Sequence, residues 1–322
     1  RFRSGSHNGR PRRHRRRRSP RNLPSERRGL IMSTGALITA EWQIERNGLL
    51  MGDGTVYDLV NIEGLAGAPP AVPSDRALAQ RNGSIAGEDY LSARSIILTF
   101  EIVDDNTSTM TAKLDALARA MGPTVDPEPI AFWLPGVANS TVVTATAHVR
   151  RRDVPIGIRF ANGVARATFL LSAADPRLYG IYQTIVSVNA AETATAGLTF
   201  PATFDLSFGG AITPGLAEVT NAGNFSAPFT FRIYGPVQDP VVTRSSDGAF
   251  LAFTKTLATA ADYLEVDTQN RTVKLGGITN NYNTLNADST WFDLAPGLNE
   301  LRLTRTGSGA ATLVVYSRNA YA

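Results

Sequence analysis

Short runs in which apolar and polar residues alternate recur along most of the chain. The run FTFRI at 229–233 has an apolar residue at every second position, the pattern of a β-strand with one buried face. Asn and Gly residues at 221–224 precede this run and Gly and Pro residues at 235–240 follow it, so tight turns bound the strand. Residues 94–102 and the two halves of 263–275 follow similar patterns. The chain is therefore predicted to be mainly β.

One stretch has helical spacing instead. Polar residues at 104–108 can cap a helix N-terminus, and Gly122 followed by Pro123 ends the pattern. Between them, apolar residues recur three or four positions apart, at Met110, Leu114, Leu117, Ala118 and Met121. We expect one helix that packs a single face onto a sheet.

The pattern divides the body of the chain into two β-rich domains. Residues 32–180 form the first predicted domain, a β-sandwich or split barrel, and the Ala-, Thr- and Gly-rich residues 181–200 are interpreted as a linker. Residues 201–322 contain strand-like runs without a helix, which is typical of an antiparallel β-sandwich. Within the first domain, residues 65–93 are rich in Pro, Gly and polar residues and predict a long excursion or extended hairpin. Segments of this kind are usually functional or bound to a partner.

The composition agrees with two globular domains. The chain has 322 residues, of which 43% are hydrophobic, enough to bury a core in each domain. It has no Cys, which excludes disulfides, thiolate metal sites and thiol catalysis. No apolar run is long enough to span a membrane, and residues 1–31 lack the apolar core of a secretory signal. We expect a cytoplasmic product.

Charge is distributed unevenly along the chain. Residues 1–31 contain 12 Arg and one Glu, whereas the remaining residues contain 20 basic and 27 acidic groups. The basic segment has too few apolar residues to fold. Three interpretations stay open: an upstream translation artefact, since GAG-AGG-AGG before Met32 would be a ribosome-binding site translated in frame; a disordered tail; or a segment that binds nucleic acid or anionic lipid without sequence specificity.

Candidate catalytic and metal-binding chemistry is sparse. Asp262, Glu265 and Asp267 form the best carboxylate cluster, but the last two are predicted on the solvent face of a hairpin beside Arg271, which favours a structural role. His148 is the sole histidine outside the basic segment, so neither a hydrolase triad nor a histidine metal site is supported. Phosphate-loop and dinucleotide motifs are missing as well. We therefore expect no enzyme, no cofactor and no metal.

A functional role is considered for two further groups. Arg150, Arg151 and Arg152 are consecutive charges at a strand end, with Arg150 and Arg152 predicted on one face, and a solvated or interface patch is favoured over a polyanion site. Tyr282 and Trp291 are candidates for a saccharide-stacking platform in the second domain, although an aromatic residue at a strand start more often lies in the core.

Five sequence motifs resemble those of a known family. FLLSAADPRLYG at 169–180 is similar to the motif that closes the N-terminal domain of siphophage distal tail proteins. Four further motifs resemble the C-terminal domain of that family, especially in phages of actinobacteria: NAGN at 221–224, FRIYGP at 231–236 followed by Asp239-Pro240, DYLEVDTQNRTVKLGG at 262–277 and WFDLAPGLNELRL at 291–303. The resemblance covers about 40–322 and is strongest from 165 onward.

The resemblance implies a structural hub and not an enzyme. Distal tail proteins form a ring, typically a hexamer, in which the N-terminal domain stacks on the tail tube. The outer sandwich, which is galectin-like or similar to a carbohydrate-binding module, offers a platform for receptor-binding proteins. The excursion at 65–93 corresponds to the extended hairpin, or belt, that embraces a neighbouring subunit. We expect that neighbour to cover the large apolar residues of the excursion, Leu78, Ile85, Tyr90 and Leu91, which are too few to close a core.

Three hypotheses follow. The leading one is a distal tail hub of the virion, assembled in the host cytoplasm, that joins the tail tube to the tail-tip apparatus. The alternative is a saccharide-binding adhesion protein that recognises host surface glycans through the C-terminal sandwich. The third, an enzyme such as a glycosidase or peptidoglycan hydrolase, lacks a credible site.

Overall fold

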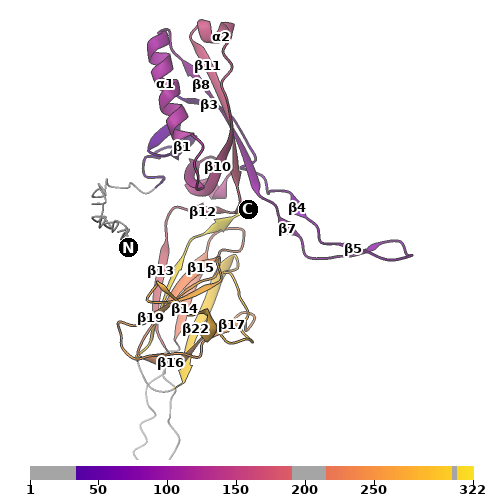
Figure 1. Cartoon of the computed structure of the whole chain (residues 1–322), viewed down its shortest axis with the longest axis vertical. Coiled ribbons are helices and arrows are strands. Elements are labelled where there is room, and N and C mark those ends of the chain that lie inside the picture. The colour runs from indigo at the N-terminus through magenta and orange to yellow at the C-terminus, as the bar shows by residue number, and fades with distance from the viewer. Residues whose placement is uncertain (1–33, 191–214, 307–309) are drawn as a thin grey trace, which may run out of the picture. The chain divides into compact units, whose positions relative to one another are not determined.

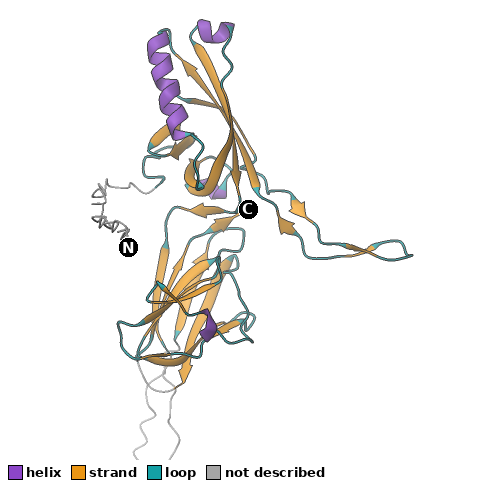
Figure 2. Cartoon of the chain, in the orientation of Figure 1, coloured by secondary structure: helices purple, strands orange, loops and turns teal. Residues whose placement is uncertain are grey.

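The computed structural model describes residues 34–190, 215–306 and 310–322. These residues form antiparallel sheets with few helical segments, as Figures 1 and 2 show. Their buried apolar side chains form two separate clusters, one in the N-terminal sheet and one between the C-terminal sheets. The mainly β, two-domain fold expected from the sequence is therefore confirmed.

The N-terminal domain is built on one nine-stranded sheet with the main order β2-β1-β9-β10-β11-β8-β3. Two short strands extend it, because β12 pairs with β10 and β24 pairs with β12. The strands of this sheet are β1 (Gln43–Arg46), β2 (Leu49–Gly52), β3 (Asp58–Glu63), β8 (Arg94–Val103), β9 (Glu128–Trp133), β10 (Val143–Asp153), β11 (Val164–Ala173), β12 (Leu178–Gly180) and β24 (Ala320–Tyr321).

This sheet curls because its two edge strands are consecutive in the chain. Only residues 53–57 connect β2 to β3, and the Gly52 amide donates to the Tyr57 carbonyl at 2.8 Å. Gly52 has φ of 97°, and a Cβ there would lie 2.0 Å from the Trp42 carbonyl oxygen, so the turn requires glycine. A flat sheet would hold β2 and β3 far apart, so the short connection produces the split-barrel shape.

The predicted helix is α1 (Thr107–Ala120), and it covers the barrel with its apolar face. Met110, Leu117 and Met121 are buried in the N-terminal core. The Asn106 side chain accepts a hydrogen bond from the Ser108 amide at 2.9 Å and caps the helix within the expected range. A second helix, α2 (Ile158–Ala161), was not expected, because four residues are too few for a helical period.

The C-terminal domain is an antiparallel sandwich. One sheet has the order β13-β23-β15-β19-β20-β21 and the other β14-β22-β16-β17, with β18 paired to β16. Phe229, Phe231 and Ile233 of β15 are buried in the core while the residues between them are half-buried, as their alternation predicted. The strands are β13 (Thr184–Asn189), β14 (Leu216–Asn221), β15 (Phe229–Tyr234), β16 (Val237–Arg244), β17 (Phe250–Ala252), β18 (Thr256–Leu257), β19 (Tyr263–Asp267), β20 (Thr272–Leu275), β21 (Thr279–Asn280), β22 (Gly297–Thr306) and β23 (Thr312–Ser317).

Part of the predicted linker belongs to this sandwich. β13 lies within residues 181–200 and pairs along its whole length with β23. As an edge strand it packs only Val186 and Val188 against the core, which leaves a weak hydrophobic pattern beside many small residues. The remainder of the expected linker, 191–200, lies outside the described residues, as does the basic segment 1–31.

The turn-rich segment 221–224 holds the end of the chain in place. Asn221 is buried, its amide nitrogen donates to the carbonyls of Phe225 at 2.8 Å and Leu294 at 3.3 Å, and its amide oxygen accepts from the Gly223 and Ala320 amides. β24 then pairs with β12, and Tyr321 is buried in the N-terminal core. The Asn and Gly residues therefore determine where the last strand returns to the first domain.

Candidate functional site

The excursion at 65–93 is an extended hairpin of two short ladders. β4 (Ala71–Val72) pairs with β7 (Tyr90–Leu91), and β5 (Arg76–Ala77) pairs with β6 (Ser84–Ile85). The hairpin projects from β3 and β8 beyond the sheet (Figure 1). We refer to residues 65–93 as the hairpin arm.

The hairpin arm exposes its large apolar side chains. Leu78, Ile85 and Tyr90 are 37%, 58% and 62% exposed, and Leu91 is half-buried. Val72, which the sequence reasoning did not single out, is 53% exposed and lies opposite Tyr90 in the ladder. Within the described residues, none of these side chains belongs to either hydrophobic core. The cover that we expect from a second subunit stays a prediction.

Hydrogen bonds rather than a core order the hairpin arm. The Ser74 hydroxyl donates to the Glu88 carbonyl at 2.5 Å, and the Asp75 carboxylate accepts from the Gly87 amide at 3.0 Å. A Cβ on Gly87 would lie 2.3 Å from the Ser74 Oγ, so the two strands approach each other closely there. The Tyr90 hydroxyl donates to the Glu88 carboxylate at 2.6 Å, and this hydrogen bond raises the pKa of Tyr90.

Arg94 fixes the base of the hairpin arm. Its guanidinium is buried and donates from Nη1 to the carbonyls of Gly64, Leu65 and Gly67 at 2.9, 3.0 and 2.8 Å. Its Nε donates to the Pro176 carbonyl at 2.7 Å. Burial lowers the pKa of Arg94, because within the described residues only carbonyl dipoles, and no carboxylate, compensate the charge. One side chain thus ties the arm and the segment after β11 to the start of β8.

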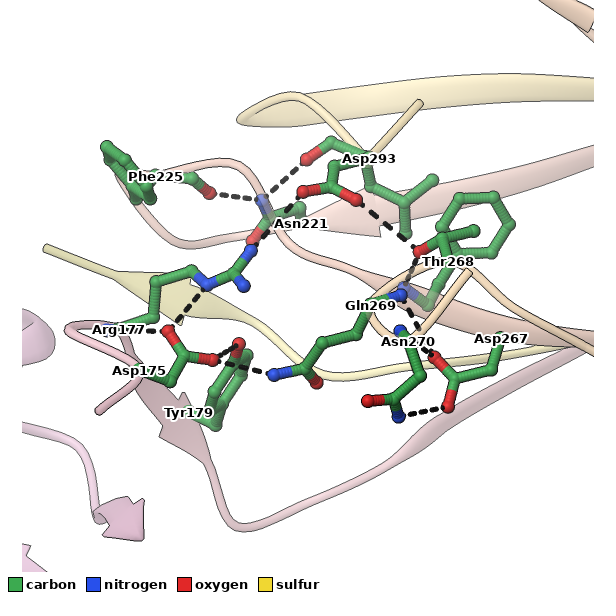
Figure 3. Close-up of polar contacts among 12 residues, drawn as sticks. Asp175, Arg177, Tyr179, Asn221, Phe225, Asp267, Thr268, Gln269, Asn270 and Asp293 are labelled. Atoms are coloured by element: carbon green, nitrogen blue, oxygen red, sulfur yellow. Dashed lines mark hydrogen bonds and ion pairs between the residues drawn. The ribbon is translucent and has the colours of Figure 1, made fainter. Parts of the chain in front are cut away.

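A polar network occupies the segment that the AADPRLYG motif encodes (Figure 3). The Asp175 carboxylate accepts from Arg177 Nε at 2.9 Å, from the Tyr179 hydroxyl at 2.6 Å and from the Gln269 amide at 2.8 Å. Arg177 also forms an ion pair with Asp293 at 3.3 Å. Gln269 and Asp293 belong to the sandwich, so the network connects this segment to the second domain.

Within this network, the pKa values of both Tyr179 and Arg177 are raised. Burial, together with the hydrogen bond to Asp175, raises the pKa of Tyr179 well above its ordinary value, so Tyr179 stays a hydroxyl donor. Burial acts to lower the pKa of Arg177, but the hydrogen bond to Asp175 and the nearby carboxylates outweigh it and raise the value. Both shifts keep Tyr179 protonated and Arg177 charged, so these two side chains maintain the hydrogen bonds and the ion pair that connect the two domains.

The structure brings the two platform candidates together. The rings of Tyr282 and Trp291 are nearly parallel, with an interplanar angle of 16° and centroids 6.4 Å apart. This separation exceeds that of a face-to-face pair, so the rings are displaced sideways and can present adjoining apolar faces. Tyr282 is 46% exposed and lies in η2 (Tyr282–Thr284), whereas Trp291 is half-buried against the second core. Their binding role stays a prediction.

The carboxylate cluster and His148, the other candidates chosen from the sequence, lie in surroundings that favour a structural role. Glu265 forms an ion pair with Arg232 at 2.8 Å, and Asp267 accepts from the backbone of the turn that follows it. His148 is half-buried on β10, and among the described residues no hydrogen bond connects it to a serine or a carboxylate. The part of the chain that the structure describes contains no cluster of three potential metal ligands.

The arginine run on β10 contains a β-bulge that the sequence did not predict. The bulge shifts the register between Val149 and Arg151, so Arg150 has no partner on β11. All three side chains are exposed, and Arg151 forms an ion pair with Asp153 at 3.1 Å. The expected placement of Arg150 and Arg152 on one face stays a prediction.

Comparison with known proteins finds a family model that matches the second domain. Residues 222–319 match the model of the siphovirus-type tail component, C-terminal domain. A search of curated protein sequences finds no match. None of the helices in the described ranges has the length and apolar content to span a membrane.

A solved structure shares the fold. The Dit protein (gp 19.1) of phage SPP1 matches with a TM-score of 0.58 and 16% identity, covering 86% of this chain and 98% of that one. It is described as a paradigm of the hub adsorption apparatus in phages that infect Gram-positive bacteria. The baseplate of phage P2 in its activated conformation with Ca has a TM-score of 0.42 and 11% identity over 86% of this chain and 97% of that one.

Residues 222–319 thus match a siphovirus-type tail component domain, and the chain shares the fold of the Dit protein of phage SPP1. The resemblance of the body of the chain to siphophage distal tail proteins, which the sequence motifs indicated, is thereby confirmed.

Proposed function

We propose that this protein is the distal tail hub of a siphophage, a ring that joins the tail tube to the tail-tip and host-recognition proteins. The observation that carries this proposal is the hairpin arm, an ordered segment with exposed apolar side chains, on a chain whose second domain matches a tail component family. The ring, its hexameric form, its contacts with the tube, its location in the virion tail and its assembly in the host cytoplasm are all parts of the proposal.

In this hub, the hairpin arm acts as the belt. Ile85 and Tyr90 lie against a neighbouring subunit, and each covered apolar side chain contributes about 1.5–3 kcal/mol before the cost of association is subtracted. A contact of this kind is heterologous, because the arm of one subunit meets a different surface of the next. Such contacts close into a ring when a whole number of equal rotations from one subunit to the next completes one full turn.

The test compares the oligomeric state of two matched variants. Replacing Ile85 and Tyr90 by Ser removes apolar side chains from the arm, whereas the control Ile278→Ser removes one that is 88% exposed in the sandwich. Light scattering after size exclusion should show the double variant shifted toward monomer, with the control unchanged. Thermal unfolding of the double variant should match that of wild-type monomer, because the removed side chains lie outside both cores. An intact ring in the double variant would show that the arm is not the belt.

A second candidate function is saccharide recognition by the sandwich. The nearly parallel rings of Tyr282 and Trp291 favour it, since adjoining aromatic faces are suited to the apolar face of a sugar. A glycan array with wild-type protein and the Tyr282→Ser variant tests this role. Loss of a wild-type signal in the variant supports it, and equal signals from both proteins contradict it.

A further inference from the structure

A polar cavity of about 530 Å³ opens beside the Trp291 ring. Its volume lies in the range of about 300–1,000 Å³ that is typical of small-molecule sites. Its lining includes Arg177, Arg244, Arg271, Asp293, Ser226 and Trp291. The nearly parallel ring of Tyr282 adjoins Trp291, so an aromatic surface and a polar cavity meet at one place.

The arginines of this cavity differ in whether a carboxylate balances their charge. Arg177 is paired with Asp175 and Asp293, and Arg244 with Asp247, so these two cations have carboxylate partners. Arg271 is exposed, and no carboxylate in the described parts of the chain pairs with it. The cavity therefore has one uncompensated cation, which is available to an anionic ligand.

The position of Arg271 is well defined. It lies at φ 50° in the turn between β19 and β20. The Asp267 carboxylate holds that turn by accepting from the amides of Gln269 at 2.9 Å and Asn270 at 3.1 Å and from the Asn270 side chain at 2.7 Å. An ordered turn removes the backbone part of the entropy cost of placing Arg271 on a ligand, while its exposed side chain is ordered only when the ligand binds.

Besides Asp293, whose carboxylate is paired with Arg177, the cavity presents two groups that can donate to a ligand. The Trp291 indole N–H and the Ser226 hydroxyl form no hydrogen bond with the described residues. Together with the Arg271 guanidinium, they match a ligand that is rich in acceptor oxygens. Because the Trp291 face adds a stacking surface, a sugar with a negatively charged group fits better than a bare anion.

We infer that this cavity binds an anionic saccharide, a sugar ring that carries a phosphate or carboxylate group. The sugar ring stacks on Trp291, and its anionic group pairs with Arg271. The site adds a charge requirement to the saccharide-recognition candidate above and rests on it, but it is independent of the ring and the hairpin arm.

The test titrates the full-length protein with four probes by isothermal titration calorimetry: glucose 6-phosphate, glucuronate, glucose and inorganic phosphate. We expect the two anionic sugars to bind more tightly than glucose or phosphate, and their affinity to fall with added salt. Arg271→Gln should weaken the binding of the anionic sugars about tenfold and leave glucose unaffected, since a hydrogen bond to a charged group is lost. Arg302→Gln, which removes an exposed arginine of β22 outside the cavity lining, is the matched control.

Each alternative outcome has a distinct meaning. Equal binding of phosphate and the anionic sugars would overturn the saccharide assignment. Equal binding of glucose and the anionic sugars, unaffected by Arg271→Gln, would overturn the charge requirement while the aromatic platform stands. If no probe binds the wild-type protein, the cavity is not a saccharide site and the platform loses its support, whereas the hub proposal is unaffected.

Discussion

Arg94 should be the residue on which the hairpin arm depends most. The Arg94→Met variant keeps most of the side-chain length but removes the donors to Gly64, Leu65, Gly67 and Pro176. The bond to Leu65 is fully buried, so its loss leaves a carbonyl without a partner at a cost of about 2 kcal/mol. The other three carbonyls are partly buried and can recover water, at about 0.5 kcal/mol each.

These contributions add to about 3.5 kcal/mol, and the buried methionine offsets about 1 kcal/mol by its apolar area. We therefore expect Arg94→Met to lower the free energy of unfolding of the N-terminal domain by about 2.5 kcal/mol. Arg94→Lys should cost less, because an ammonium group offers three N–H donors at a single point and can keep part of the set. Urea denaturation measures the change, and hydrogen exchange should show faster exchange around residues 64–67.

A matched control separates the clamp from a general loss of charge. Arg166 forms an ion pair with Glu101 on the sheet surface, and both side chains are partly exposed. Arg166→Met should cost at most about 1 kcal/mol, as for other surface pairs. If Arg94→Met is as stable as Arg166→Met and exchange at the arm base is unchanged, the interpretation of Arg94 as a clamp is wrong.

Three further predictions concern the rest of the chain. Asn221→Ala should lower the free energy of unfolding, measured by urea denaturation, by about 2–3 kcal/mol, because it removes the partners of buried backbone groups. The control Asn224→Ala removes one exposed hydrogen bond to the Ala322 amide and should cost less than about 1 kcal/mol. The hydrogen bond from Lys113, with those from Thr109 and the Asn106 amide, lowers the pKa of Asp104 to about 2. The contribution of Asp104 to stability is therefore present above about pH 4 and is lost as the pH falls toward 2. Asp104→Asn should reduce the difference in thermal stability between pH 6 and pH 2. Limited proteolysis followed by mass spectrometry should cut between 190 and 200, where small residues predominate, and cuts confined to residues 1–31 would count against a domain boundary there.

Elements with a clear local period could be predicted from the sequence. The strand at 229–233 and the helix that begins near Asn106 each carry their own pattern and turn or cap residues, so local chemistry was sufficient. β13 could not be recognised in the same way, because as an edge strand it buries only two small apolar side chains. The bulge at Arg150 was missed because it depends on the register with β11, which is set by tertiary pairing.

The same distinction applies to the candidate sites, where residue types could be chosen from the sequence but their arrangement in space could not be predicted. Tyr282 and Trp291 could be chosen by residue type, but only the fold shows that their rings are nearly parallel and that Trp291 lines a cavity. Arg94 was missed because it stands at the start of an ordinary strand, and its partners are carbonyls 27 to 82 residues away. Backbone carbonyls have no sequence signature, so a buried arginine of this kind becomes visible only in the structure.

The central claim, a closed ring built by the hairpin arms, is tested most directly by electron microscopy of the purified wild-type protein. Class averages should show closed rings with a central channel, because heterologous contacts of one kind repeat around an axis until they close. The proposed hexamer adds the expectation of sixfold symmetry. Single particles of monomer size at micromolar concentration, or open filaments, would contradict the proposed hub.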